Sequence, residues 1–399
     1  MQLIDTLKEL AARQLPEVRA MRRHLHKHPE LSFQEHETMA FIAEKLTAYG
    51  IPFTSGVAGT GLVALIEGQD PNSKITALRA DMDALPIQEV SGREHGSVNA
   101  GVMHACGHDA HTASLLGAAN ILMQTRDKWK GTVKLIFQPG EEKLPGGASL
   151  MIKDGALQNP APSSIFGQHV TNLFGAGKVG FRSGLYMAST DELYLTIFGK
   201  GGHAAIPATY NNPLLIASKV LLALNDRFMN PDTKNIPDHP TVLAFGKIIG
   251  QGATNVIPDK VVIDGTFRTM NEAWRDEAHR LIMQIATETA EQMGGKADLE
   301  IIKGYPFLVN DVALTERARQ NAIVYLGAEH VIDLDRWMAA EDFAYYSQVM
   351  PACFYRFGIR NESQGITSSV HTSNFDIDEE ALITSTGLMA WLAIAELRH

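Results

Sequence analysis

Cysteine is scarce in this chain, with 2 among its 399 residues. So few cysteines exclude the disulfide framework of a small secreted domain and fit a reducing compartment. No apolar run is long enough to span a bilayer, and Asp5 and Glu9 interrupt any signal-peptide core near the N-terminus. We therefore expect a cytoplasmic protein that has no membrane partner.

Excess positive charge is also lacking. Asp and Glu number 45 against 35 Lys and Arg, which gives a formal charge of −10 and argues against a nucleic acid or an anionic membrane as partner. The composition is ordinary for a globular protein and contains no low-complexity tract. A chain of 399 residues is too long for one simple core, so we expect two domains.

Strand and helix patterns alternate between about residues 35 and 185. Apolar runs predict strands at 61–66, 74–79, 132–137 and 163–168, and a helix at 111–124 that Asp109 is placed to cap. This alternation is typical of an α/β fold, with a mixed, mostly parallel sheet covered by helices on both faces.

The pattern changes after about residue 190. The predicted order is strand 193–198, helix 213–228, strands 241–249 and 260–270, helix 274–293 and strand 298–302. This β-α-β-β-α-β order is that of a ferredoxin-like unit. We predict that residues 187–304 form an inserted lid and dimerisation domain, and that residues 1–186 and 305–399 form the catalytic domain. The candidate hinges between the two domains are 186–190 and 303–310.

Residues 103–111, with the sequence MHACGHDAH, form the most informative segment of the chain. They place one of the two cysteines between histidines, just ahead of the 111–124 helix. Thiolate, imidazole and carboxylate are the ligands of a borderline-soft divalent cation. The segment therefore predicts a metal site, and a metal site favours hydrolysis.

Acid, imidazole and thiol groups stand at five places at or beyond the ends of predicted strands. They are Asp81 and Asp83, Cys106 and His108, Glu141 and Glu142, His169, and His371. Each has an ordinary structural explanation when taken alone, such as a packed cysteine, a buried histidine or a solvated glutamate pair. Ligands of open α/β sheets bind at the carboxyl ends of the strands, so the joint occurrence favours one site.

Amide hydrolysis explains why such residues are needed together. A divalent cation supplies a nucleophilic water at neutral pH, and a free carboxylate takes the proton from that water and passes it to the leaving nitrogen. Two consecutive glutamates can divide the tasks, so that one binds metal while the other faces the water. Cys106 would bind as the thiolate.

The whole chain resembles the aminoacylase, hippurate hydrolase and auxin-conjugate hydrolase group of dinuclear metallo-amidohydrolases. That resemblance implies a metal-dependent exopeptidase-like catalytic domain. The matching stretches are 23–30 (RHLHKHPE), 78–86 (LRADMDALP), 103–111 (MHACGHDAH), 138–142 (QPGEE), 199–205 (GKGGHAA), 255–258 (NVIP), 340–343 (AEDF) and 371–373 (HTS).

The resemblance also implies roles for individual residues. The implied ligands of two divalent ions are Cys106, His108, Glu142, His169 and His371. The thiolate and imidazoles suit Zn, Ni or Co, and the carboxylates also admit Mn. Glu141 is the implied general base, and Asp81 keeps a role in orienting a ligand. His203 reaches the active site across a homodimer interface to stabilise the oxyanion, while Asn255 and Arg268 hold the substrate carboxylate.

The sequence departs from the pattern of related enzymes at two places. Residues 79–81 (RAD) stand where the wider superfamily has a His-x-Asp motif, so Arg79 replaces the ligand histidine, which is normal for the narrower group with its Cys-Gly-His loop. Residues 143–145 (KLP) replace the small, glycine-rich sequence that commonly follows the glutamates, and they alter the rim of the substrate site. Both glutamates are retained.

We therefore expect an amidohydrolase that cleaves N-acyl-L-amino acids of the acetyl, benzoyl or indole-acetyl type. A metallo-dipeptidase or carboxypeptidase on the same scaffold stays open as an alternative. So does a cysteine hydrolase that pairs Cys106 with His108 or His104, and so does a binding protein without catalysis. The sequence does not name the acyl group, although Trp337, Phe343 and Leu144 are candidates for lining its pocket.

Overall fold

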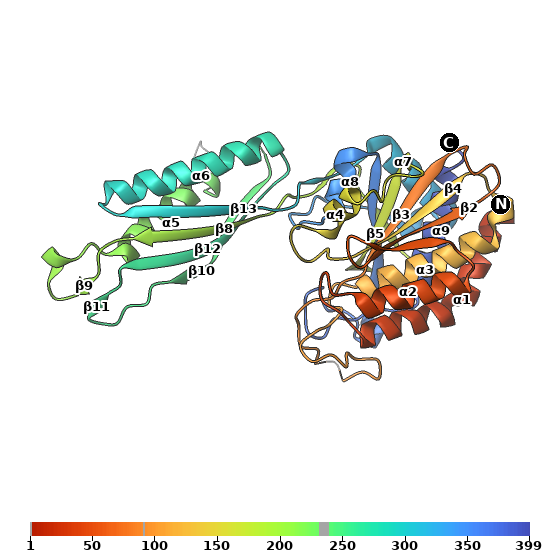
Figure 1. Cartoon of the computed structure of the whole chain (residues 1–399), viewed down its shortest axis with the longest axis horizontal. Coiled ribbons are helices and arrows are strands. Elements are labelled where there is room, and N and C mark those ends of the chain that lie inside the picture. Colours follow the sequence, from red (N-terminus) through yellow and green to blue (C-terminus); the bar gives the residue numbers. More distant parts are fainter. Residues whose placement is uncertain (1, 91, 231–238) are drawn as a thin grey trace. The chain divides into compact units, whose positions relative to one another are not determined.

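The structure is a computed structural model that describes residues 2–90, 92–230 and 239–399. It divides the chain into two compact units, both visible in Figure 1. Unit 1 comprises Met1–Tyr186, Val309–Arg336 and Asp342–His399, and unit 2 comprises Met187–Leu308 and Trp337–Glu341. The short second piece of unit 2 was not anticipated from the sequence. Strands β7 (Gly184–Met187) and β14 (Leu308–Asn310) lie where the chain passes between the units.

Unit 1 is built on an eight-stranded sheet with the order β1-β2-β4-β3-β5-β16-β6-β15. The strands are β1 (Phe53–Val57), β2 (Gly61–Glu67), β3 (Ile75–Asp81), β4 (Thr132–Gln138), β5 (Ile165–Gly175), β6 (Val179–Phe181), β15 (Val331–Asp333) and β16 (Ala352–Arg360). The central strands β4, β3, β5 and β16 run parallel, whereas β1 and β2 are antiparallel to their neighbours. This confirms the predicted mixed, mostly parallel sheet.

Helices on one face of this sheet form two layers. Those in contact with the strands are α2 (His36–Ala48), α3 (His108–Gln124), α7 (Val312–Leu326) and α9 (Ala381–Glu396), and α1 (Gln2–Lys27) packs on α3 and α9. Helix α9 is apolar all round and buried along its length, as a central core helix must be. Pro16 lies inside α1, so one helix spans it. In the part of the chain that the structure describes, no helix has the length and apolarity needed to cross a membrane.

Helices α4 (Gly147–Lys153) and α8 (Ala344–Val349) lie on the opposite face of the sheet. Lys134 of β4 donates to the carbonyl oxygens of Ala156 and Gln158, just beyond α4, at 3.0 and 2.6 Å. Its neighbours Val133 and Leu135 belong to the core beneath α3. Successive strand residues point to opposite faces, so helices lie on both sides of the sheet, as predicted.

The start of α3 differs from the sequence prediction. The helix begins at His108, preceded by Gly107 in the left-handed region with φ 86°, and no side chain caps it. Asp109 therefore does not cap the helix and lies inside its first turn. Its Oδ2 accepts hydrogen bonds from Arg22 Nε at 2.7 Å and from His26 Nδ1 at 2.8 Å. A side chain at position 107 would also collide with Val170, since a Cβ there lies 2.6 Å from its Cγ2.

Unit 2 has a four-stranded antiparallel sheet with the order β10-β12-β8-β13. Its elements are β8 (Asp191–Phe198), α5 (Pro213–Phe228), β10 (Thr241–Ile249), β12 (Lys260–Thr269), α6 (Glu272–Gln292) and β13 (Lys296–Lys303), with the short pair β9 (Gly202–His203) and β11 (Val256–Ile257). Leu193, Leu195 and Ile197 of β8 are buried with α5 and α6, while the alternate residues are more exposed. This confirms the predicted ferredoxin-like order.

A buried ion-pair network joins three elements of unit 2. Asp191, at the start of β8, accepts from Arg275 Nη2 at 2.5 Å and from His279 Nε2 at 2.7 Å, both on α6. The amide of Gly304, just after β13, donates to Asp191 Oδ1 at 3.2 Å. Burial raises the pKa of Asp191, but the hydrogen bonds from His279 and Arg275 outweigh it, so the pKa lies below 3.8. The carboxylate therefore stabilises unit 2 in its ionised form.

We predict that Asp191→Asn lowers the free energy of unfolding of unit 2 by about 3 kcal/mol at pH 7, because the buried guanidinium loses its partner. A depressed folded-state pKa contributes stability above the unfolded-state value of 3.8 and loses it as the pH falls below. Chemical denaturation should therefore give a wild-type advantage that shrinks from about pH 5 to about pH 3. Asp276, an exposed residue that pairs with Lys303, is the control. Asp276→Asn should lower the free energy of unfolding by less than about 1 kcal/mol. An Asp191→Asn deficit that does not change with pH would contradict this.

Candidate metal centre

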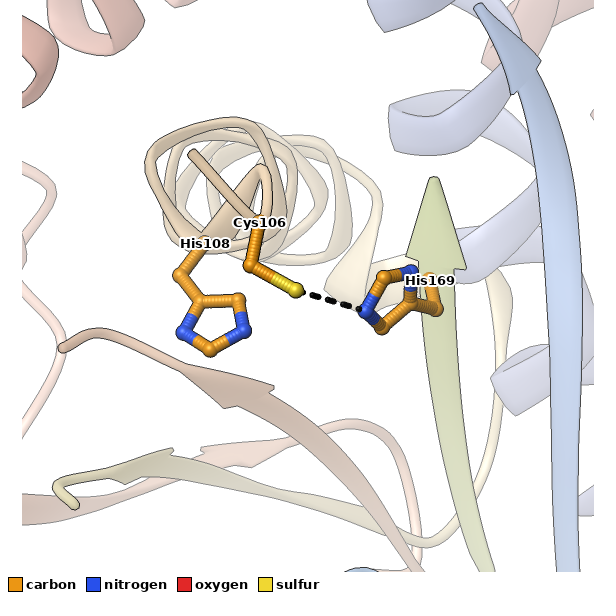
Figure 2. Close-up of side chains that lie close together, drawn as sticks. All are labelled: Cys106, His108 and His169. Carbon is orange, nitrogen blue, oxygen red and sulfur yellow. Dashed lines mark hydrogen bonds between the residues drawn. The ribbon is translucent and has the colours of Figure 1, made fainter. Parts of the chain in front are cut away.

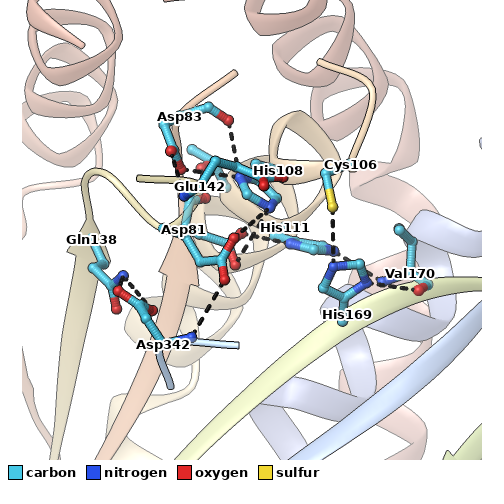
Figure 3. A network of polar contacts seen from close by, with 12 residues as sticks. Asp81, Asp83, Cys106, His108, His111, Gln138, Glu142, His169, Val170 and Asp342 are labelled. Carbon is cyan, nitrogen blue, oxygen red and sulfur yellow. Dashed lines mark hydrogen bonds and ion pairs between the residues drawn. The ribbon is translucent and has the colours of Figure 1, made fainter. Parts of the chain in front are cut away.

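The candidate residues of unit 1 gather at the carboxyl ends of its parallel strands (Figure 3). Asp81 is the last residue of β3, and Glu141 and Glu142 lie in the loop after β4. His169 is on β5, and His108 is the first residue of α3. Parallel strands end at the same edge of a sheet, so segments far apart in sequence meet there.

Cys106 is the centre of the cluster. Its Sγ lies 3.4 Å from His169 Nε2 and 3.3 Å from His371 Nε2. Figure 2 shows the side chains of Cys106 and His169 pointing toward each other. Glu142 Oε1 lies 3.2 Å from the same nitrogen of His371. His371 is tied to this segment by its backbone N–H, which donates to the carbonyl oxygen of Ala105 at 2.7 Å.

The predicted ligands form overlapping groups whose donor atoms lie within 4.8 Å of one another. One group is Cys106, His108 and His169, another is Cys106, Glu142 and His371, and a third is His108, Glu141 and Glu142. The structure therefore brings together all five residues predicted to bind metal, with the predicted base beside them.

Hydrogen bonds to the far sides of two imidazoles direct their other nitrogens into the cluster. His169 Nδ1 lies 2.8 Å from the Val170 carbonyl oxygen, which leaves Nε2 facing Cys106. His108 Nδ1 lies 2.9 Å from the carbonyl oxygen of Asp83 and 3.1 Å from its Oδ1. Metal-binding histidines are typically oriented by such bonds.

Two atoms that face the cluster are buried without a hydrogen-bond partner, namely His108 Nε2 and Glu142 Oε1. Buried polar atoms normally have partners, because an unsatisfied one costs free energy. An imidazole nitrogen and a carboxylate oxygen, both turned inward beside a thiol, are donor atoms that a divalent cation can bind. The residues present therefore fit a metal centre.

The charge balance of the cluster also favours a cation. Burial raises the pKa of the Cys106 thiol well above 9.0, and the nearby carboxylates of Glu142 and Glu141 raise it further. Burial lowers the pKa of His108, but Asp81 and Asp83 outweigh it and raise the value to about 10. The site thus carries an excess of negative charge, which binding of a divalent ion would neutralise.

Asp81 and Asp83 have different neighbours. Asp81 Oδ1 lies 2.6 Å from His111 Nδ1, and His111 Nε2 accepts the backbone N–H of Val170 at 2.9 Å. Both nitrogens of His111 are thereby occupied, so Asp81 orients a histidine that has no atom left for a metal. Its other oxygen, Oδ2, pairs with Arg79 Nη1 at 2.5 Å.

Asp83 is the residue for which the sequence indicated no role. Besides holding His108, it accepts the backbone N–H of Glu142 at 3.0 Å and the hydroxyl of Ser32 at 2.6 Å, both on Oδ2. One buried carboxylate thus orients two of the predicted ligands. The feature of the sequence that could have identified Asp83 was its position two residues after Asp81, just beyond the end of β3.

The other predicted site residues, His203, Asn255 and Arg268, belong to unit 2. His203 is exposed on β9, and the carbonyl of Asn255 accepts the N–H of Ala204 at 3.0 Å, so these two are neighbours. Arg268 lies near the opposite end of β12, eight residues beyond Lys260 and therefore roughly 26 Å along the strand. Within one chain, Asn255 and Arg268 do not come together.

The three residues suggested for the acyl pocket differ in their exposure. Phe343 is fully buried, with its ring 4.9 Å from that of Phe354 and 5.5 Å from that of Tyr346, so it is a packing residue. Leu144 is half-buried, and Trp337 is exposed in unit 2.

Known proteins resemble this chain along its length. The profile of peptidase family M20/M25/M40 matches residues 77–394. N-acetyl-L-cysteine deacetylase of Bacillus subtilis is 39% identical, covering 92% of this chain and 85% of that protein. IAA-amino acid hydrolase ILR1-like 5 of Arabidopsis thaliana is 38% identical, covering 94% and 85%. The solved structure of Bacillus subtilis YXEP, a dinuclear metal binding peptidase from the M20 family, is 33% identical with a TM-score of 0.81, covering 96% and 98%.

The chain therefore belongs to peptidase family M20/M25/M40. Within that family it is a metal-binding hydrolase of the amidohydrolase group and acts on amide bonds. The resemblance drawn from its motifs is confirmed.

We predict that Asp83→Asn weakens metal binding about 10- to 100-fold, because both His108 and the backbone of Glu142 lose the carboxylate that orients them. Competition with a chromophoric chelator measures the affinity. Asp154→Asn, at a carboxylate that accepts the N–H of Ala58 instead, should bind metal like the wild type. Unchanged affinity in Asp83→Asn would show that the ligands are held without it.

Proposed function

We propose that this chain hydrolyses the amide bond of small N-acyl-L-amino acids with two divalent metal ions and a glutamate base. The convergence of donor atoms on Cys106 beside Glu141 carries the proposal. The residues that would hold the ions are Cys106, His108, Glu142, His169 and His371. When bound, such ions polarise a carbonyl and lower the pKa of a water towards about 7.

Glu141 is proposed as the base because its surroundings differ from those of Glu142. Glu141 Oε1 accepts the backbone N–H of Asp342 at 3.3 Å, and Oε2 lies 4.0 Å from His108 Nε2. Glu142 instead approaches His371 and Cys106. A carboxylate beside the ligands can take a proton from water and deliver it to the leaving nitrogen.

The proposed metals follow from the donors. One thiol and three imidazoles suit Zn, Co or Ni, and the carboxylate of Glu142 also admits Mn. Two ions rather than one are supported by the three overlapping donor groups and by the dinuclear site named for the similar YXEP structure.

The proposed substrate class rests on the relatives and on Arg268. N-acetyl-L-cysteine deacetylase and IAA-amino acid hydrolase are named for N-acyl amino acids, which carry a free carboxylate. Arg268 is half-buried, burial lowers its pKa, and it has no acidic partner within ion-pair distance in the described parts of the chain. A half-buried guanidinium with no acidic side chain beside it is suited to bind a substrate carboxylate bidentately.

A homodimer through unit 2 is part of the proposal. Since Asn255 and His203 lie far from Arg268 along one sheet, one substrate can meet all three only if two chains contribute. Strand β10 supplies a suitable edge, because Lys247 is its only charged residue, and Ile248 and Ile249 are 53% and 40% exposed. The opposite edge strand, β13, carries charged residues that discourage pairing.

Helix α5, which packs beside β10, extends this apolar surface with Leu215 and Leu222, 62% and 67% exposed. We predict that Leu215→Glu combined with Leu222→Glu weakens the dimer more than about 100-fold, because each unpaired carboxylate is disfavoured in an apolar contact. Light scattering after gel filtration measures the mass. Met283→Glu, at an exposed residue of α6, is the control and should stay dimeric. A double variant that remains dimeric would place the interface elsewhere.

The cysteine hydrolase alternative is less well supported. A nucleophilic cysteine needs a lowered pKa, whereas burial and carboxylates raise that of Cys106. His104 is buried and its two ring nitrogens make no hydrogen bond, so it is not engaged with the thiol. The dipeptidase alternative shares the metal centre and differs only in its substrate.

The test is hydrolysis of N-acetyl, N-benzoyl and indole-acetyl amino acids and of dipeptides, by metal-free protein and by protein reloaded with Mn, Co, Ni or Zn. We predict metal-dependent release of amino acid from the N-acyl substrates. Glu141→Gln should bind two ions per chain and lose about 100- to 10,000-fold in kcat, because the amide cannot accept the proton.

The competing outcomes of this test are distinct. Preferred cleavage of dipeptides would select the dipeptidase. Chelator-resistant activity that iodoacetamide abolishes would select the cysteine hydrolase. Substantial turnover by metal-loaded Glu141→Gln would reject Glu141 as the base.

A further inference from the structure

We propose that Asp342 is a positioning residue for Glu141, since its carboxylate fastens both ends of the loop at 139–147 and its backbone N–H holds the Glu141 carboxylate. The importance of Glu141 rests on the proposed function, whereas the fastening of the loop does not. The sequence singled out residues 340–343 as a motif without indicating what they do.

The carboxylate of Asp342 contacts the residues on both sides of the segment 139–147. Gln138, the last residue of β4, donates from Nε2 to both carboxylate oxygens of Asp342 at 2.8 Å, as Figure 3 shows. Ala148, in the first turn of α4, donates its backbone N–H to Asp342 Oδ2 at 2.9 Å. One carboxylate therefore joins the residue before the loop to the residue after it. Between them lie Glu141 and Glu142.

Arg79 anchors this carboxylate to the sheet. Its Nη2 donates to Asp342 Oδ1 at 2.8 Å, and its Nε donates to Gln138 Oε1 at 2.8 Å. Arg79, Gln138 and Asp342 are each fully buried, so the ion pair is shielded from water. A buried network in which every polar group has a partner is rigid, and removal of one group leaves the others without a partner.

The backbone of Asp342 holds the Glu141 carboxylate. Asp342 donates its own N–H to Glu141 Oε1 at 3.3 Å. The next glutamate has a separate anchor, since the N–H of Glu142 is bound by Asp83. Two different aspartates thus hold two consecutive glutamates, which explains how one can turn to metal and the other to water.

The test compares Asp342→Ala and Asp342→Asn with the wild type. Hydrogen exchange of residues 139–148 in the metal-free protein should be at least about tenfold faster in Asp342→Ala, because Ala148 loses its acceptor. In metal-loaded protein, kcat should fall about 100-fold, as for a catalytic group misplaced by about 1 Å, with KM and metal content unchanged. Asp342→Asn keeps one oxygen acceptor, so its exchange rate and its kcat should lie between those of Asp342→Ala and the wild type. If Asp342→Ala does not fold, Gln138→Met removes one link and should act in the same direction.

Glu396→Gln is the matched control. Glu396 is another buried carboxylate of unit 1, paired with Lys74 and Arg317, and it lies on α9 outside the metal centre. Its substitution should lower stability while leaving kcat and the exchange of 139–148 unchanged. Unchanged exchange in Asp342→Ala, or a loss of kcat that merely follows lost metal, would overturn the inference. If the wild type cleaves no N-acyl amino acid, the proposed function is wrong. The exchange rates in metal-free protein would still show whether Asp342 holds the segment 139–147.

Discussion

Concentrated negative charge at the carboxyl edge of one sheet is the constraint on which the rest of unit 1 depends. Asp81, Asp83 and Asp342 are fully buried there, with Glu141 nearly so. Arg79 offsets part of this charge by pairing with Asp81 and Asp342. The remaining carboxylates face the Cys106 thiol and the imidazoles of His108, His169 and His371. Buried charge is tolerated only when it is paired or bound to metal, so the same cluster both requires cations and positions them.

The parallel strands make this concentration possible. Because β3, β4 and β5 end at one edge, a short polar segment after each strand is enough to build the centre. Helix α3 contributes its first residue, and Gly107 lets the chain turn sharply enough to place Cys106 and His108 on the same side. The buried helices behind the sheet hold these segments rigidly, which a centre with fixed donor positions needs.

The candidate ligands that the structure brings together could be selected from the sequence, because most of them lie in local motifs of unusual composition and His169 follows a predicted strand. Cys106 and His108 share one loop, and Glu141 and Glu142 are adjacent, so no long-range geometry is needed to select them. The sequence did not show that Asp81 orients His111 whereas Asp83 orients His108 and Glu142. This difference depends on which neighbours each side chain meets after β3 ends. The burial of His26 was likewise not indicated by the sequence, because its partner Asp109 is 83 positions away.

Long-range register explains the other differences. Asn255 and Arg268 are separated by only a short stretch of sequence, yet an extended strand carries them to opposite ends of unit 2. The proposed role of Asp342 depends on contacts with β3, β4 and α4, none of which the motif at 340–343 itself specifies. Fold class and element order, by contrast, follow from local apolar periodicity, which is why they could be predicted.

The measurement that tests the central claim most directly is X-ray absorption spectroscopy of the zinc-loaded protein, paired with metal analysis. The account predicts two ions per chain and a sulfur scatterer at about 2.3 Å that disappears in Cys106→Ser. Imidazole and carboxylate scatterers should persist in that variant. A wild-type spectrum with only nitrogen and oxygen neighbours would contradict the claim that Cys106 is the centre of the metal site.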